Sequence, residues 1–285
     1  MTPNPIIWQP SPERIGETAM WRFMQAAGCE SYDELYAWSI DNSAAFWESL
    51  CAFCGVEFDE QPTTILARPD NIMNAGWFEG SRLNYAQHLL RRGGDEAAVV
   101  FFGEDGSRRE LSRDALRGQV AAVAAGLRAA GVTKGDRVGA FLPNCPEAIV
   151  AMLATTSLGA IWSSCSPDFG VNGVVDRFGQ IEPRVLFAVN AYNYNGKTCD
   201  TRPTVEGVVA AVDSIGTTVV VPFVTGLSTD TSLENAVAWD DFARADEPLE
   251  FEPVDFSHPL YVMYSSGTTG VPKCIVHGHG GTLLQ

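Results

Sequence analysis

The stretch "GDRVGAFLPNCPEAIVAMLATTSLGAIWSSCSPDFG" spans residues 135–170. Within it, "DRVGAFL" and "AIWSSC" have the length and apolar composition of buried strands. Pro146 and Glu147 open the segment between them and predict a helix, because proline fits the first helical turn and the helix dipole stabilises a carboxylate there. A strand, a helix and a second strand in this order predict two parallel strands joined by a crossover helix.

The same alternation continues on both sides of this stretch. The predicted strands are residues 97–102, 108–111, 184–189, 217–223 and 260–266, and the predicted helices are residues 112–131, 174–181 and 202–216. Ser112 is the expected N-cap of the first of these helices. The pattern predicts an α/β fold with a mostly parallel sheet covered on both faces. Ligands of such sheets bind in the loops that follow the carboxyl ends of the strands.

Residues 1–90 predict a helical N-terminal cap that precedes an α/β domain at residues 91–285. In "SYDELYAW", Ser31 and Glu34 have the spacing of a capping box, and Gly55 follows a second helical segment as its C-cap. Most tryptophans of the chain lie in this region. Aromatic side chains of this kind usually pack an extension onto a neighbouring body, and contact with a ligand is the alternative.

The cysteine pattern favours packing over chemistry. The chain has seven cysteines, of which Cys51 and Cys54 form a C-x-x-C pair. A zinc or redox interpretation would need a second pair or a thioredoxin-like setting. Instead the pair lies among apolar residues at helical spacing in "NSAAFWESLCAFCGVEF", which predicts buried helix cysteines. The odd count indicates a reducing compartment.

The charge of the chain excludes whole classes of partner. Thirty-five acidic residues against nineteen basic ones give a formal charge of -16. Nucleic acid and anionic membrane both need a cationic surface, so neither is an expected partner. No apolar run approaches the ~18 residues of a membrane span, and no signal-peptide pattern is present, so we expect a cytoplasmic protein. Any anionic ligand must be held by a local device.

The stretch "YVMYSSGTTGVPKCIVHGHGG", residues 261–281, contains the candidate for that device. Its loop lies between two extended apolar segments. The glycines permit positive φ and close backbone approach, so that N–H groups form an anion-binding nest, and the hydroxyls and the lysine add donors and charge. This combination suits a polyphosphate, and the alternative is a hairpin loop with a solvated lysine. The candidate residues are Ser265, Ser266, Gly267, Thr268, Thr269, Gly270 and Lys273.

Two common phosphate motifs do not fit this loop. A Walker loop, G-x-x-x-x-G-K-[ST], laid on Gly267 puts Pro272 at the second glycine and Cys274 at the hydroxyl position. A Walker loop also runs into a helix, whereas "KCIVHGH" continues as an extended run. The dinucleotide fingerprint G-x-G-x-x-G fails as well, because no third glycine follows Gly270 at the required spacing.

The segment "YSSGTTGVPK" resembles the phosphate-loop signature of the acyl-adenylate-forming superfamily, which includes acyl-CoA synthetases, luciferases and adenylation domains of peptide synthetases. Residues 135–170 are similar to the large domain upstream of that loop. "SYDELYAWSIDNSAAFWESL" is similar to the N-terminal extension of short-chain acyl-CoA synthetases. "WFEGSRLNYAQHLL", "YNGK" and "FSHPLYVMYSSGTTGVPKCIVHGHGGTLLQ" resemble the members that activate acetoacetate. The resemblance covers residues 6–285.

The resemblance implies the reaction and its small-molecule partners. The carboxylate of acetoacetate attacks the α-phosphorus of ATP and releases pyrophosphate, and the thiol of coenzyme A then displaces AMP from the acyl-adenylate. The loop would orient the β- and γ-phosphates, with Mg²⁺ as the bridging cation and no metal ligand assigned within this segment. Acetate or propionate is the alternative acid. The oligomeric state is not indicated.

In the family, the rest of the machinery follows this loop, including a small C-terminal domain with a catalytic lysine. We therefore expect the chain to be the first part of a longer enzyme, with the C-terminal domain absent and no catalytic residue assigned to this segment. Such a piece would not catalyse the whole reaction alone. The alternative from another class is a truncated nucleotide-binding module without catalysis.

Two further residues are candidates through the same resemblance. Lys197 lies where short-chain synthetases place basic residues near the coenzyme A nucleotide, and an ordinary turn at Asn195-Gly196 is the alternative. His277 lies where some relatives have a histidine in the acyl or nucleotide pocket, and structural packing is the alternative. Neither His277 nor His279 has a carboxylate or cysteine at metal-ligand spacing.

Overall fold

The structure is a computed structural model that describes residues 7–244, 247–265 and 270–285. It divides the chain into two compact units, with the boundary after Ser81. Among the described residues, no helix combines the length and the apolar character needed to cross a membrane.

The first unit consists of short helices and one hairpin. Its elements are α1 (Pro12–Gly16), α2 (Ala19–Ala26), α3 (Tyr32–Asp41), α4 (Ser43–Cys54), β1 (Thr64–Ala67) and β2 (Gly76–Glu79), with β1 and β2 antiparallel. The hydroxyl of Ser31 accepts a hydrogen bond from the Glu34 N–H at 3.2 Å, as predicted. The Glu34 carboxylate, however, accepts from the N–H of Glu30, not of Ser31, so the capping box is only half formed. Gly55 ends α4 with φ 63°, as predicted.

The C-x-x-C pair of α4 is only partly buried. Cys51 is buried and Cys54 is exposed, so the prediction of two buried cysteines is wrong for Cys54. Cys54 is the last residue of the helix, where the chain turns away at Gly55 and little covers the final turn. Burial raises the pKa of the Cys51 thiol to about 11, which keeps it protonated and unreactive.

The second unit contains the predicted sheet. Seven strands lie in the order β12 (Ala236–Ala238), β11 (Thr217–Val221), β8 (Val185–Val189), β6 (Arg137–Phe141), β7 (Ile161–Cys165), β14 (Pro259–Ser265) and β15 (Lys273–Gly278). Neighbouring strands are parallel except for β14 and β15, which are antiparallel. The α/β class and the mostly parallel sheet are therefore confirmed.

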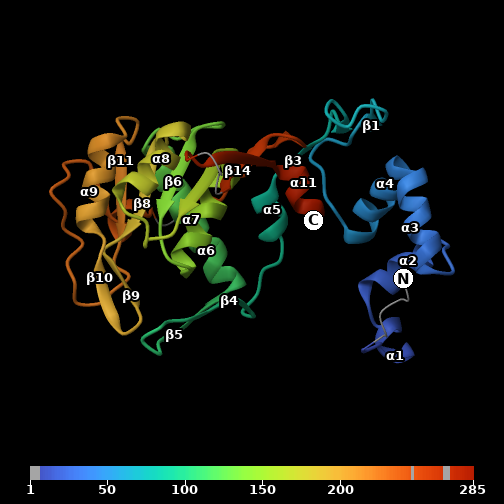
Figure 1. The fold of residues 1–285 in the computed structure, drawn as a ribbon, viewed down its shortest axis with the longest axis horizontal. Helices are drawn as coiled ribbons and strands as arrows, with labels where there is room; N and C mark the ends of the chain where they lie inside the picture. The colour runs from blue at the N-terminus through green and yellow to red at the C-terminus, as the bar shows by residue number, and fades with distance from the viewer. Residues whose placement is uncertain (1–6, 245–246, 266–269) are drawn as a thin grey trace. The chain divides into compact units, whose positions relative to one another are not determined.

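Two helices cover each face of this sheet (Figure 1). The helices α6 (Arg113–Ala129) and α7 (Pro146–Ser157) bury one face, and α8 (Val171–Ile181) and α9 (Arg202–Ala211) bury the other. The alternation along β8 follows from the strand period of two, because Phe187 belongs to the core under α6 and α7, whereas Leu186 and Ala188 belong to the core under α8 and α9. This two-sided burial explains why the strands are apolar nearly throughout.

The remaining elements connect or flank the sheet. They are β3 (Arg82–Leu83), α5 (Tyr85–Leu89), β4 (Ala97–Phe102), β5 (Arg108–Ser112), β9 (Ala191–Tyr194), β10 (Lys197–Asp200), α10 (Trp239–Phe242), β13 (Val254–Asp255) and α11 (His279–Leu284). The predicted hairpin β4–β5 is present, but it forms a separate two-stranded sheet. Ser112 caps α6 by accepting from the N–H of Ala115 at 3.2 Å, as predicted.

Candidate functional site

The predicted phosphate loop joins β14 to β15. Ser265 and Lys273 are register partners at its two ends. Lys273 is exposed and Ser265 is half-buried. Gly270 lies in the connection with φ 105°, in the region that favours glycine. The other predicted members lie outside the described residues, and their role stays a prediction: Ser266, Gly267, Thr268 and Thr269.

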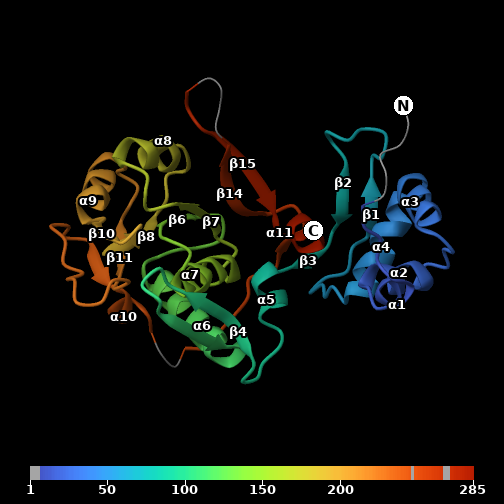
Figure 2. The ribbon, with the colours of Figure 1, turned by 60° about the horizontal axis from the view of Figure 1, so that its bottom comes forward.

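The loop leaves the sheet at the edge where ligands are expected. β14 runs parallel to β7, with Tyr261 beside Trp162, and β7 runs parallel to β6. The chain therefore leaves all three strands on one edge, formed by their carboxyl ends. Figure 2 shows β14 and β15 side by side next to β7. The parallel pairing of β14 with β7 thus places the described ends of the motif at this edge.

A half-buried tyrosine and an arginine lie beside the loop-side end of β14. The hydroxyl of Tyr264 is hydrogen-bonded to the hydroxyl of Ser163 at 3.0 Å, and burial raises the pKa of Tyr264, so the phenol stays neutral. The guanidinium of Arg177, on α8, lies 4.2 Å from the centre of the Phe169 ring and 5.6 Å from that of Tyr264. Together with Lys273, Arg177 places positive charge around this end of the hairpin in an otherwise acidic chain.

Two adjoining cavities lie at the carboxyl edge of β6, β7, β8 and β11. Their volumes are about 330 and 550 Å³, and both are lined by Glu104, Pro143, Asn144, Tyr192 and Asn193. The second cavity also reaches the end of β7 and the segment that follows it, at Cys165, Ser166, Pro167 and Asp168. Strand ends and the loops after them therefore supply most of the lining.

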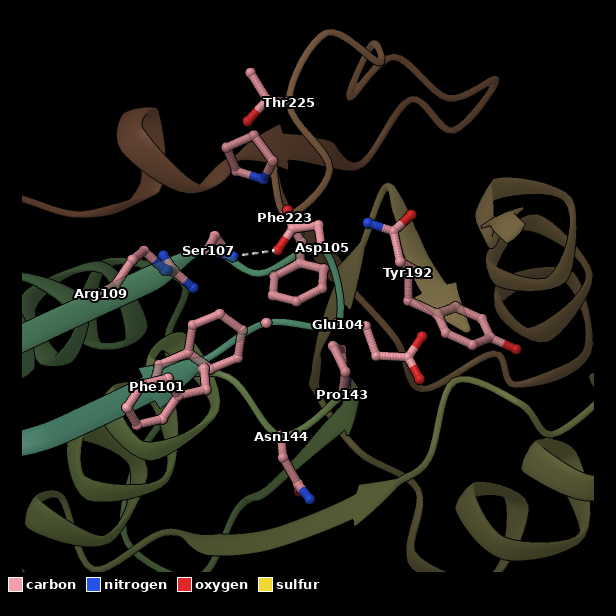
Figure 3. Close-up of a pocket in the computed structure, with 14 residues that line it drawn as sticks. Phe101, Glu104, Asp105, Ser107, Arg109, Pro143, Asn144, Tyr192, Phe223 and Thr225 are labelled. Carbon is pink, nitrogen blue, oxygen red and sulfur yellow. Dashed lines mark hydrogen bonds between the residues drawn. The ribbon is translucent and has the colours of Figure 1, made fainter. Parts of the chain in front are cut away.

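Figure 3 shows the smaller of these cavities. One wall is the β4–β5 hairpin, whose turn is held by the Ser107 N–H donating to the Asp105 carboxylate at 2.9 Å. Close to that turn, Arg109 makes a two-point ion pair with Glu147 on α7, at 2.6 and 3.0 Å. The other walls come from the loop after β6, from β9 and from the segment after β11. The ion pair ties the hairpin wall to the helix layer.

Lys197 lies in the hairpin that forms another part of the cavity lining. Asn195 and Gly196 have φ values of 48° and 70°, which makes them the predicted turn between β9 and β10. Lys197 follows this turn, is exposed, and is the register partner of Tyr194. Tyr194 lines the larger cavity. The turn and the candidate contact are thus compatible, and the contact stays a prediction.

The two histidines after the loop occupy different environments. His277 is half-buried, and its ring centre lies 5.2 Å from that of Tyr261, its register partner. His279 is fully buried, its Nδ1 accepts from the Tyr85 N–H at 3.2 Å, and burial lowers its pKa to about 3. His279 is therefore a neutral packing residue, and a pocket role for His277 stays a prediction. Within the described ranges, no cluster of three or more His, Cys, Asp or Glu side chains is placed to hold a metal ion.

Several residues of this edge were not predicted from the sequence. Asn144 lies in the loop after β6, and Tyr192 lies in β9, shortly after the end of β8. Their position after a predicted strand was the available signal, because strand ends on one edge converge in a parallel sheet. Arg177 had no such signal, since a helical arginine reveals its partner only after folding.

Comparisons with known proteins agree with this fold. Residues 86–285 match the family described as AMP-binding enzyme, and residues 32–89 match the family described as acetyl-coenzyme A synthetase N-terminus. The chain belongs to the AMP-binding enzyme family. This confirms the family resemblance that the loop and residues 135–170 indicated.

Within that family the chain is a homologue of acetoacetyl-CoA synthetases. It is 42% identical over 296 residues to acetoacetyl-CoA synthetase of Macaca fascicularis and 43% identical over 289 residues to acetoacetyl-coenzyme A synthetase of Rhizobium meliloti. Each match covers 98% of this chain and 44% of the relative. The structure of acetoacetyl-CoA synthetase from Streptomyces lividans superposes with a TM-score of 0.90 at 39% identity, covering 97% of this chain and 44% of that one. The chain therefore spans less than half the length of the relatives it matches.

Proposed function

We propose that the protein acts as an ATP-dependent acid–CoA ligase that converts acetoacetate, ATP and coenzyme A into acetoacetyl-CoA, AMP and pyrophosphate. The observation that carries this proposal is the placement of the "YSSGTTGVPK" segment. Its described ends, Ser265 and Lys273, meet at the carboxyl edge of a mostly parallel sheet. The homology to acetoacetyl-CoA synthetases supports the choice of reaction.

The proposed first step forms the acyl-adenylate. A carboxylate oxygen of the acid attacks the α-phosphorus of ATP, the bond from that phosphorus to the bridging oxygen breaks, and pyrophosphate leaves with the electron pair. Such phosphoryl chemistry depends on positioning and on neutralisation of charge. Lys273 would offset the charge of the β- and γ-phosphates, and the hydroxyl of Ser265 would donate to a phosphate oxygen.

The proposed second step uses coenzyme A. The thiol loses its proton and attacks the acyl carbon, and AMP leaves. The cavities at the ends of β6, β7 and β8 are a suitable approach for this substrate, because they open beside the same sheet edge as the loop. Lys197, on the hairpin that contributes Tyr194 to the larger cavity, would contact a phosphate of the coenzyme A nucleotide.

Mg²⁺ enters this proposal only as a companion of the nucleotide. The described residues contain no cluster of three or more acidic, histidine or cysteine side chains that fits a metal ion. A cation held mostly by ATP phosphates and water is common for Mg²⁺.

The choice of acid rests on homology. Besides the acetoacetyl-CoA synthetases, a malonamoyl-CoA synthetase of Penicillium aethiopicum is 38% identical over 301 residues. Both named acids are short and carry a carbonyl group near the carboxylate. Acetate and propionate, which lack that group, are the alternatives.

Exchange of labelled pyrophosphate into ATP tests this function, with the protein expressed from its whole reading frame. We expect exchange only when an acid is present, and faster with acetoacetate than with acetate or propionate at equal concentration. Exchange that no acid stimulates would overturn the ligase proposal. Faster exchange with acetate or propionate would overturn the choice of acetoacetate alone.

A further inference from the structure

The side chain of Gln180, on α8, is hydrogen-bonded to Pro272 and Cys274, the two residues that flank Lys273. Its Nε2 donates to the backbone oxygen of Pro272 at 2.9 Å. Its Oε1 accepts from the thiol of Cys274 at 3.6 Å. One amide group thus links a helix to the two residues that flank the lysine, which lie 92 and 94 positions further along the chain.

The helix that carries Gln180 is a firm support. Val174, Phe178 and Ile181 of α8 are buried in the core beneath that face of the sheet. Gln180 itself is exposed, and its Nε2 also donates to the backbone oxygen of Asp176 one turn earlier at 2.6 Å, which fixes the side chain against its own helix. The hydrogen bond to Asp176 therefore orients the amide independently of the hairpin.

The strand that begins at Lys273 has few other supports. β15 is the last strand of the sheet and pairs only with β14 among the described strands. Strand ends next to a loop open easily when a single ladder holds them. The two hydrogen bonds of Gln180 are thus placed where β15 most needs a second anchor.

The strand period relates these bonds to the direction of the lysine. Successive side chains of a strand point to opposite faces, so the side chain of Cys274 faces α8 and that of Lys273 leaves on the other face. Ser265, the register partner of Lys273, shares that face. Holding the backbone at Pro272 and the side chain at Cys274 fixes the orientation of the residue between them.

We propose that Gln180 is a positioning residue that holds Lys273 in the orientation needed to contact the phosphates of ATP. This inference rests on the proposed function of the loop. Gln180 does not touch the nucleotide itself. It removes motion at the start of β15, so that the lysine is oriented before ATP binds.

A double-mutant cycle in the pyrophosphate exchange reaction tests this role, again with the protein from its whole reading frame. Gln180→Ala should raise the KM for ATP about three- to tenfold, the effect of one net hydrogen bond, and leave the KM for acetoacetate unchanged. In a Lys273→Ala background the same substitution should have almost no further effect, because its target is gone. Asn172→Ala, another exposed polar residue of α8, is the matched control and should leave both constants unchanged.

Hydrogen exchange of the 285-residue chain itself separates this proposal from the proposed function. In Gln180→Ala, the amides of residues 272–276 should exchange about three- to tenfold faster than in the parent and in Asn172→Ala, by the same hydrogen-bond argument. Unchanged exchange there would overturn the anchoring by Gln180, whatever the enzyme activity. If hydrogen exchange is faster but Gln180→Ala raises the KM for ATP equally in the wild-type and Lys273→Ala backgrounds, the action through Lys273 would be overturned. Wild-type protein that catalyses no acid-dependent pyrophosphate exchange would instead overturn the function on which the inference rests.

Discussion

Ser265 and Lys273 are register partners in an antiparallel strand pair, although residues 266–272 lie between them in the chain. The pairing brings a hydroxyl and an ammonium group to the same face of the hairpin. It also places both at the sheet edge that the parallel strands β6, β7 and β14 share. The candidate site is therefore a product of sheet topology as much as of the loop sequence.

Packing between α6 and α10 depends on Gly126. A Cβ at this position would lie 2.8 Å from Cδ1 of Phe242 and still closer to the backbone oxygen of that residue. Gly126→Ala should therefore lower the free energy of unfolding by about 2 kcal/mol, measured by urea denaturation. Gly118→Ala, in the same helix with nothing within 4 Å of its Cβ, should raise it by roughly 0.5–1 kcal/mol. Equal effects of the two substitutions would contradict this packing.

A buried amide joins three segments of the second unit. The Nδ2 of Asn84 donates to the backbone oxygens of Thr156 at 3.0 Å and Glu252 at 2.9 Å, and its Oδ1 accepts from the N–H of Ala86 at 2.9 Å. Asn84→Ala removes these hydrogen bonds, and the Thr156 oxygen keeps only the Gly159 N–H as a donor, at 3.1 Å. The substitution should cost about 2–3 kcal/mol of unfolding free energy. Asn172→Ala, at an exposed position, should change it by less than about 0.5 kcal/mol. A loss of that small size at Asn84 would show that the segments hold together without the amide.

The neutral state of His279 predicts a loss of stability in acid. Its pKa is lowered to about 3 by burial, whereas an unfolded histidine has a pKa of about 6.5. Between these values the unfolded chain binds a proton that the folded chain does not, so stability falls as pH falls, by up to about 1.4 kcal/mol per pH unit from this group. Unfolding of His279→Gln between pH 6.5 and 4 should show a shallower dependence on pH than wild type. A His279→Gln slope equal to that of wild type would rule out a buried neutral imidazole.

The position of Lys197 predicts an effect on one substrate. Lys197→Ala should raise the KM for coenzyme A about three- to tenfold, by loss of one exposed contact to a phosphate, and leave the KM values for ATP and acetoacetate unchanged. Arg108→Ala, on the exposed β5 strand, is the control and should leave all three constants unchanged. Steady-state kinetics of the ligase reaction measure these values. An unchanged KM for coenzyme A in Lys197→Ala would contradict the contact between Lys197 and coenzyme A.

Local signals in the sequence were enough to predict the helices and strands that build the sheet. Pro146 at the start of α7 and Ser112 as the cap of α6 act through their own backbone and first turn, so no distant partner is needed. The hairpin β4–β5 was predicted for the same reason. Its separation from the main sheet was not predictable, because the composition of a strand does not show which other strand it pairs with.

The parts of the site that could not be predicted depend on distant contacts. Gln180 and Arg177 lie on the helix that was predicted at residues 174–181, but their partners Pro272 and Tyr264 follow much later in the chain. Cys54 was wrongly predicted as buried because helical spacing identifies a stripe and not what covers its end. Long-range packing decides these cases.

The measurement that tests the central claim most directly is acetoacetate-dependent exchange of pyrophosphate into ATP by Lys273→Ala, in the protein from its whole reading frame. Loss of a charged contact to a phosphate predicts a rate about 10- to 100-fold below wild type. Thermal unfolding should be unchanged, because Lys273 is exposed. Lys134→Ala, an exposed lysine paired with Glu252 away from the loop, should exchange at the wild-type rate. A Lys273→Ala protein that exchanges pyrophosphate as fast as wild type would contradict the assignment of this loop to ATP.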